Sequence, residues 1–133
     1  MKVLVDTSVW SLVLRRSSSL NLEYQKILEQ LISDYRIQMI GPIRQELLSG
    51  IKESHQFELL KERLAAFPDY PIQTNDFELA AKFFNLCRKK GIQGSNTDFL
   101  ICAIAANNDW EIFTTDKDFD HFQAYLPIKL YSV

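Results

Sequence analysis

Short apolar runs alternate along the chain with longer segments in which apolar residues recur at helical spacing. The runs predict strands, of which the third is weakened by prolines, at residues 3–5, 36–40, 68–72, 110–115 and 128–131. The helical spacing predicts helices at residues 8–16, 21–34, 42–50, 54–67, 76–90, 95–107 and 119–125. Because strands alternate with helices, the pattern predicts an α/β sandwich with a central, mostly parallel sheet of four to five strands.

The first predicted strand is followed directly by an acidic residue. Val3, Leu4 and Val5 do not alternate with polar residues, which is typical of a parallel strand buried on both faces. Asp6 therefore lies at the carboxyl end of a buried strand, where open α/β sheets place their ligands. A carboxylate at this position either caps the following helix or belongs to a binding or catalytic site.

Three further acidic residues take comparable places in the predicted layout. Asp116 follows a strand, Asp98 opens a helix, and Glu46 lies in the helix after the second strand. Because the carboxyl ends of parallel strands share one edge, these residues can converge with Asp6. Each also has a purely structural interpretation. The aspartates can cap helices, Ser95 and Asp98 fit a capping box, and Glu46 can be solvated at the border of an apolar stripe.

The helix that Asp98 opens is apolar on every side from residue 99 to residue 106, as a fully buried helix is. Its polar amino end must meet other polar groups. Carboxylates brought together there would repel by ~4 kcal/mol per close pair at an effective dielectric near 20. Such a cluster requires raised pKa values or a divalent cation, and ligands that are all oxygen favour Mg²⁺ or Mn²⁺. The expected chemistry is metal-assisted attack of water on a phosphodiester.

Composition bounds the class of protein. A chain of 133 residues predicts a single domain spanning residues 1–133. The net charge of −2 gives no overall basic field, which counts against a nucleic-acid partner unless a local basic patch exists. Basic residues that could line such a path are Arg15, Arg16, Lys52, Arg88, Lys89, Lys90 and Lys117. For residues 88–90, helix termination is the alternative role.

Cysteine content and hydropathy predict a cytoplasmic protein with no membrane partner. Cys87 and Cys102 are far apart and belong to no Cys-x-x-Cys motif, so we expect two reduced thiols in a reducing compartment. The amino-terminal apolar run is broken by Asp6 and has no cationic leader, which argues against a signal peptide. No apolar stretch reaches the length that a membrane span requires.

Four segments resemble, in order, the motifs of PIN-domain proteins, especially the VapC-like toxins of toxin–antitoxin modules. They are VLVDTSVW (residues 3–10), PIRQEL (residues 42–47), TDFLICAIA (residues 97–105) and TTDKDF (residues 114–119). The resemblance covers essentially the whole chain and implies a PIN-like three-layer α/β/α sandwich. It also implies Mg²⁺- or Mn²⁺-dependent endoribonuclease activity on structured RNA, such as transfer RNA or a ribosomal RNA loop.

The same resemblance implies roles for particular residues and partners. The catalytic and metal-binding acids would be Asp6, Glu46, Asp98 and Asp116. Thr7 and Ser8 match hydroxyl positions that support the first aspartate. The fourth motif is the loosest, since Asp118 and Asp120 lie on the same segment; Asp116 is favoured because it directly follows a strand. The expected partners are RNA, a second copy of the chain in a homodimer, and a cognate antitoxin whose tail occupies the acidic site.

The leading hypothesis from the sequence is therefore a metal-dependent endoribonuclease toxin. One alternative is a catalytically silent module that binds a cation or a basic peptide, and another is a housekeeping PIN nuclease of RNA processing. A third is a phospho-acceptor signalling domain, which requires adjacent acids after strand one and a lysine after the last strand. Here Val5 precedes Asp6, and Lys129 lies inside the predicted last strand.

Overall fold

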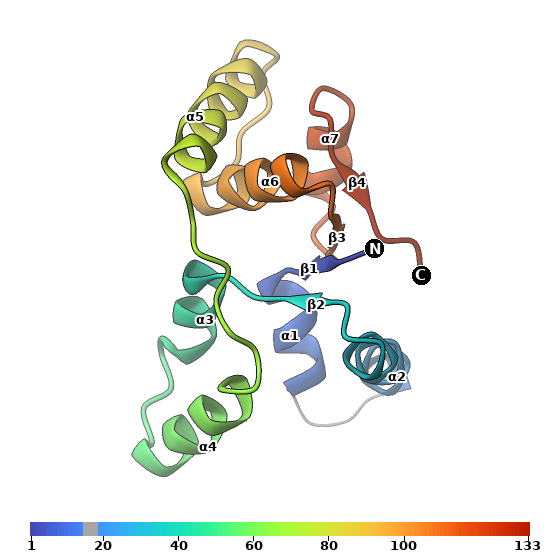
Figure 1. The fold of residues 1–133 in the computed structure, drawn as a ribbon, viewed down its shortest axis with the longest axis vertical. Coiled ribbons are helices and arrows are strands. Elements are labelled where there is room, and N and C mark those ends of the chain that lie inside the picture. Colours follow the sequence, from blue (N-terminus) through green and yellow to red (C-terminus); the bar gives the residue numbers. More distant parts are fainter. Residues whose placement is uncertain (15–18) are drawn as a thin grey trace.

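A parallel sheet forms the centre of the molecule (Figure 1). The computed structural model describes residues 1–14 and 19–133. Within these residues the sheet has four strands, in the order β2-β1-β3-β4: β1 (Val3–Val5), β2 (Ile37–Gln38), β3 (Glu111–Phe113) and β4 (Lys129–Leu130). All the pairings are parallel, and β1 is hydrogen bonded on both sides. The four carboxyl ends therefore share one edge.

Helices cover both faces of the sheet, so the predicted three-layer α/β/α sandwich is confirmed. They are α1 (Thr7–Leu14), α2 (Ser19–Ser33), α3 (Gly41–Leu48), α4 (Ser54–Leu64), α5 (Thr74–Lys89), α6 (Asn96–Asn108) and α7 (Asp118–Gln123). In Figure 1, α6 lies on one side of the strands and α1 on the other. α5 packs along α6, and α1 packs against α2 and α3.

The weak strand predicted at residues 68–72 is wrong as a strand. In this segment Asp69 makes only an isolated parallel bridge to Met39, just beyond β2, and the Tyr70 N–H donates to the Met39 carbonyl at 2.8 Å. Pro68 and Pro71 flank this contact and have no N–H to donate, so the pairing ends after one step. The end of the first predicted helix, Arg15 and Arg16, and the turn at residues 17–18 lie outside the described residues.

The core is built on the elements whose apolar runs are continuous. Val3, Leu4 and Val5 are each 0% exposed, as the unbroken run predicts. α6 is buried on all sides from Phe99 to Ala105. Cys87 and Cys102 are buried free thiols that belong to this core. No helix in the described part of the chain is long and apolar enough to cross a membrane.

A carboxylate is also fully enclosed in the fold, at the first turn of α5. Asp76 is 0% exposed. It accepts hydrogen bonds from the Tyr70 hydroxyl at 3.0 Å, the Gln73 N–H at 2.9 Å and the Asn107 side-chain amide at 2.8 Å. These three donors come from the segment before α5, the N-cap of α5 and the end of α6. Asp76 therefore joins α5 to α6 at the end of this helix pair.

We expect Asp76→Ala to lower the free energy of unfolding by about 3 kcal/mol, because buried donors to a charged acceptor lose their partner. Urea denaturation measures the change. Glu78→Ala is the matched control, since Glu78 is an exposed acid on the same helix and its loss should cost less than about 0.5 kcal/mol. Equal losses in the two variants would contradict a structural role for the Asp76 cluster.

Candidate active site

Asp6 is held by two hydroxyl groups at the carboxyl edge of the sheet. It is 7% exposed, and its N–H donates to the Phe113 carbonyl at 2.9 Å. One oxygen, Oδ2, accepts from Ser8 Oγ at 2.9 Å and from Thr114 Oγ1 at 2.8 Å. The two hydroxyl oxygens lie 3.2 Å apart. The other oxygen, Oδ1, takes no part in these bonds, so the carboxylate is fixed with one oxygen left for another partner.

The same hydroxyl groups tie Asp116 to this edge. Ser8 Oγ accepts from the Thr115 N–H at 3.0 Å, and Thr114 Oγ1 accepts from the Asp116 N–H at 3.0 Å. Asp116 Oδ1 then accepts from the Asp118 N–H at 2.9 Å. Asp118 thus supports Asp116 through its backbone, while its own side chain is exposed.

Asp98 lies in the first turn of α6 and forms the predicted capping box. Its Oδ2 accepts from the Ser95 N–H at 3.1 Å, and Ser95 Oγ accepts from the Asp98 N–H at 3.1 Å. The pKa of Asp98 is raised above its ordinary value. Burial is the largest cause; the hydrogen bonds with Ser95 oppose it, and the negative charges of Asp6 and Asp116 add to it. Asp98 therefore caps α6 and also faces the charges of Asp6 and Asp116.

Glu46 in α3 faces the same group of charges. Its pKa is raised, first by loss of hydration and then by the charges of Asp6 and Asp98. Its side chain is exposed overall, so this loss of hydration is partial. The Thr7 side chain lowers the pKa of Glu46 and so opposes this increase. No hydrogen bond of ordinary geometry joins Thr7 to Glu46, and Thr7 Oγ1 is buried without a hydrogen-bond partner. Of the two hydroxyls expected to support Asp6, only Ser8 contacts it.

No basic residue in the described part of the chain neutralises these acids. The ion pairs there are Arg36–Glu111, Arg44–Asp69, Lys61–Glu58 and Lys129–Asp109. Arg44, two residues before Glu46, instead holds α3 to the segment after α4. It donates to the carbonyls of Leu64 (2.9 Å) and Phe67 and to Asp69 Oδ1 (3.0 Å). The acids thus retain a local excess of negative charge.

This set of donors fits a hard divalent cation in its chemistry. Its ligating atoms are all oxygens, and Asp6, Asp98 and Asp116 each have an oxygen outside the hydrogen bonds described above. Within residues 1–14 and 19–133, no three acidic, histidine or cysteine side chains come close enough together to form a ready-made metal site. The edge therefore combines interacting carboxylates with a coordination shell that is not assembled in advance.

Residues beside Asp116 extend this edge into an open polar hollow of about 340 Å³. Thr114, Lys117 and Asp120 are among the residues that line it. Thr114 is the site residue that sequence reasoning did not single out. Its only signal was a hydroxyl residue directly after a buried strand, two positions before a candidate acid.

Lys129, which a phospho-acceptor domain would place near the acids, lies at the other end of the sheet. It pairs with Asp109, two residues before β3 begins. Asp6 and Asp116 lie instead beyond the carboxyl ends of β1 and β3. This arrangement does not match the phospho-acceptor hypothesis.

Comparison with known proteins assigns the family. The family model described as "PIN domain" matches residues 3–125, so this chain belongs to the PIN-domain family. No match was found among curated protein sequences.

Solved structures show the same fold. FitAcB from Neisseria gonorrhoeae has a TM-score of 0.79 and 20% identity, covering 98% of this chain and 96% of that one. VapBC2 from Rickettsia felis, bound to a DNA fragment from its promoter, has a TM-score of 0.80 and 18% identity, covering 98% of each chain. VapBC-5 from Mycobacterium tuberculosis, a member of the VapBC family of toxin–antitoxin systems, has a TM-score of 0.72 and 19% identity, covering 100% of each chain.

Proposed function

We propose that this protein is a Mg²⁺- or Mn²⁺-dependent endoribonuclease that acts as the toxin of a toxin–antitoxin pair. One observation carries the proposal: acids from four separate segments interact at one sheet edge, and no ion pair of the described residues neutralises them. Membership of the PIN-domain family supports nuclease chemistry, and the likeness to VapBC and FitAcB structures supports the toxin role.

In this proposal Asp6, Glu46, Asp98 and Asp116 hold the ion and are the catalytic acids. The bound ion would activate water and balance the charge that develops on the phosphodiester. Ser8 and Thr114 keep the Asp6 carboxylate in one orientation. Such supporting bonds reduce the reorganisation needed when a carboxylate takes up a ligand. Carboxylates bind a metal ion in their ionised form, and the pKa values of Glu46 and Asp98 are raised, so metal affinity should fall as the solution is acidified.

The proposed substrate is structured RNA, such as transfer RNA or a ribosomal RNA loop. Lys117 lines the hollow beside Asp116 and has an exposed side chain, so it can contact a phosphate next to the acids. Arg88, Lys89 and Lys90 at the end of α5 supply a second group of exposed cations. These local groups provide basic contacts in a chain whose net charge is −2.

The proposed protein partners are an antitoxin and a second copy of the chain, in the cytoplasm. A groove of mixed polarity, of about 190 Å³, lies between α1 and α4, where Leu14 and Leu59 are 37% and 38% exposed. An antitoxin segment would cover this groove while its tail reaches the acidic edge. Phe77 of α5 is 55% exposed and, with Ala80, Ala81 and Leu100, lines an apolar hollow that a homodimer would cover.

Incubation of the purified protein with total RNA, in Mn²⁺ and in EDTA, tests the proposal. We expect discrete RNA fragments in Mn²⁺ and intact RNA in EDTA. A folded, metal-loaded protein that leaves every RNA class intact would contradict the nuclease. If calorimetry then showed bound metal, a silent cation-binding module would explain the acids better. A small antitoxin-like reading frame immediately upstream of the gene separates a toxin from a housekeeping nuclease.

A further inference from the structure

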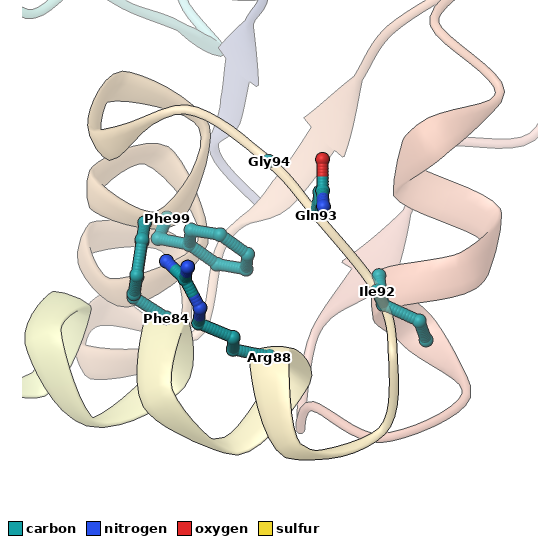
Figure 2. Close-up of a pocket in the computed structure, with 6 residues that line it drawn as sticks. All are labelled: Phe84, Arg88, Ile92, Gln93, Gly94 and Phe99. Atoms are coloured by element: carbon teal, nitrogen blue, oxygen red, sulfur yellow. The ribbon is translucent and has the colours of Figure 1, made fainter.

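A small pocket lies next to the acidic edge, between the end of α5 and the beginning of α6. Figure 2 shows its lining: Phe84 and Arg88 from α5, Ile92, Gln93 and Gly94 from the connecting loop, and Phe99 from α6. Its volume is about 180 Å³. Sites for drug-sized ligands have volumes of about 300–1,000 Å³, so this pocket suits a single ring system.

Its aromatic floor connects the pocket to the two segments that carry Asp98 and Asp116. Phe84 packs on Phe99 with ring centroids 5.5 Å apart, and Phe99 packs on Phe122 at 4.9 Å. Phe122 packs in turn on Phe119 at 5.2 Å. Phe99 directly follows Asp98, while Phe119 lies in α7, three residues after Asp116. Gly94, which lines the pocket, directly precedes Ser95, whose N–H donates to Asp98 Oδ2, so a ligand in the pocket would lie beside the acidic edge.

The loop wall of the pocket is preformed. A Cβ atom on Gly94 would lie 2.6 Å from Phe122 Cζ and 2.9 Å from Phe99 Cε2, so only glycine allows the loop backbone to approach these rings so closely. At the other end, the Ile92 N–H donates to the Cys87 carbonyl at 2.9 Å. Gly91 adopts a φ of 75°, which glycine accommodates without strain. Binding a ligand here requires little ordering of the loop.

Arg88 gives the pocket its chemistry. Its guanidinium lies over the Phe84 ring, 5.8 Å from the centroid, and extends from α5 toward the pocket (Figure 2). Within the described residues it makes no ion pair or hydrogen bond, so its planar set of N–H donors is available. Gln93 adds a side-chain amide, and no acidic residue lines the pocket. Such a site favours a flat ligand with hydrogen-bond acceptors.

A second cation–aromatic pair lies on the same side. Lys90 Nζ is 5.8 Å from the centroid of the Tyr125 ring, which is 45% exposed. Aromatic rings and arginine guanidinium planes are the surfaces on which proteins stack unpaired RNA bases, while nearby cations contact the phosphates. The two pairs thus supply both kinds of contact on the same side of the molecule.

We propose that this pocket is a base-recognition subsite, which takes one unpaired base of the RNA next to the bond that is cleaved. Guanine is the expected base because its O6 and N7 acceptors match the two-pronged guanidinium of Arg88. This inference rests on the proposed nuclease function and adds a specificity determinant to it. Arg88 binds the base, and the acids act on the neighbouring phosphodiester.

Sequencing the ends of fragments from a randomised RNA library tests the subsite. We expect wild-type protein to enrich guanine at one fixed position beside the cleaved bond. Arg88→Ala should reduce this preference about tenfold, and Arg88→Lys should also lose it because a lysine keeps the charge but not the planar donors. Lys89→Ala is the matched control: it removes a neighbouring charge outside the pocket and should weaken binding of all sequences equally.

A binding measurement separates failure of the subsite from failure of the nuclease. In the Asp98→Asn background, fluorescence anisotropy compares short single-stranded RNAs that differ in one base. Base-dependent affinity that Arg88→Ala removes supports the subsite even if no RNA is cleaved. If wild-type protein cleaves RNA with a base profile that Arg88→Ala leaves unchanged, the nuclease stands and the subsite is overturned. Affinity that is independent of the base in both proteins also overturns it.

Discussion

Asp98→Asn is expected to abolish metal-dependent RNA cleavage, with a loss of more than about a hundredfold in rate. Residues that only support a metal ligand already cost about 10–100-fold when they are changed, and Asp98 is proposed as a ligand itself. Asparagine keeps a side-chain oxygen that can accept the Ser95 N–H, which Asp98 Oδ2 now accepts at 3.1 Å. The capping box therefore survives the substitution, and the protein stays folded.

Asp118→Asn is the matched control for this prediction. Asp118 has an exposed side chain, and its contact with Asp116 uses its backbone N–H, which the substitution retains. We expect an initial cleavage rate close to wild type in Mn²⁺, with both variants showing the circular dichroism of the native fold. Loss of activity in Asp118→Asn, with activity kept in Asp98→Asn, would show that the acids of this edge have been assigned wrongly.

Asp98→Asn should also stabilise the metal-free protein at neutral pH. Because folding raises the pKa of Asp98, the folded state binds its proton more tightly than the unfolded state does. The contribution of Asp98 to stability therefore decreases as the pH rises from its ordinary value of 3.8 through the raised value. In EDTA at pH 7, Asp98→Asn should melt at a higher temperature than wild type, and the difference should shrink on acidification. A lower Tm at pH 7 would refute this account.

Phe113→Ala is expected to lower the free energy of unfolding by about 3–5 kcal/mol, the usual cost of deleting a buried phenylalanine ring. Phe113 is 0% exposed and pairs in register with Val5 of β1. Its ring packs on Tyr24 from α2, with centroids 5.8 Å apart, and on Tyr131 at 5.0 Å. Removing the ring opens a cavity where α2, the sheet and the segment after β4 meet.

Leu22→Ala provides the control for this cavity. Leu22 is 49% exposed on α2, so truncation should change stability by less than about 1 kcal/mol. Urea denaturation should show a lower midpoint for Phe113→Ala with an unchanged slope, which indicates lost stability rather than a changed denatured state. Similar midpoints for the two variants would mean that Phe113 is not part of the core that holds β1 and β3 together.

The strands illustrate what the sequence pattern contained about the fold. β1 has the predicted bounds, Val3–Val5, because this apolar run is bounded by the charged residues Lys2 and Asp6. β2 is shorter than the strand predicted at residues 36–40, because along its length it pairs only with β1. Beyond β2, the pairing is limited to a single bridge from Met39 to Asp69. Apolar content alone does not reveal how many backbone partners a strand has.

Helix boundaries depended on local chemistry that periodicity does not report. α5 begins at Thr74 rather than residue 76, because Gln73 is the N-cap and Asp76 reaches back to its N–H. The sequence pattern predicts only that Asp76 begins a strongly apolar helix, whereas the burial of its side chain depends on Tyr70 and Asn107 from other segments. A sequence does not show that a first-turn acid will be enclosed by a second helix.

The candidate site was predictable in its acids but not in its connections. Asp6 and Asp116 follow buried strands, which the sequence shows directly. The hydrogen bond from Thr114 to Asp6 depends on the strand register that sets Val5 opposite Phe113. The sequence pattern does not specify this register. The catalytic and metal-binding roles of Asp6, Glu46, Asp98 and Asp116 stay predictions that the experiments above address.

The central position of β1 has a consequence for biosynthesis. β1 is synthesised before the other three strands, yet one of its two neighbours is β3, and one of the two hydroxyls that hold Asp6 belongs to Thr114, 108 residues later. Pairing over such a separation is slow to form and requires nearly the whole described chain. A growing chain that ends before Thr114 therefore has neither a complete sheet nor an assembled acidic edge. Assembly of the acidic edge therefore waits until this region has been synthesised.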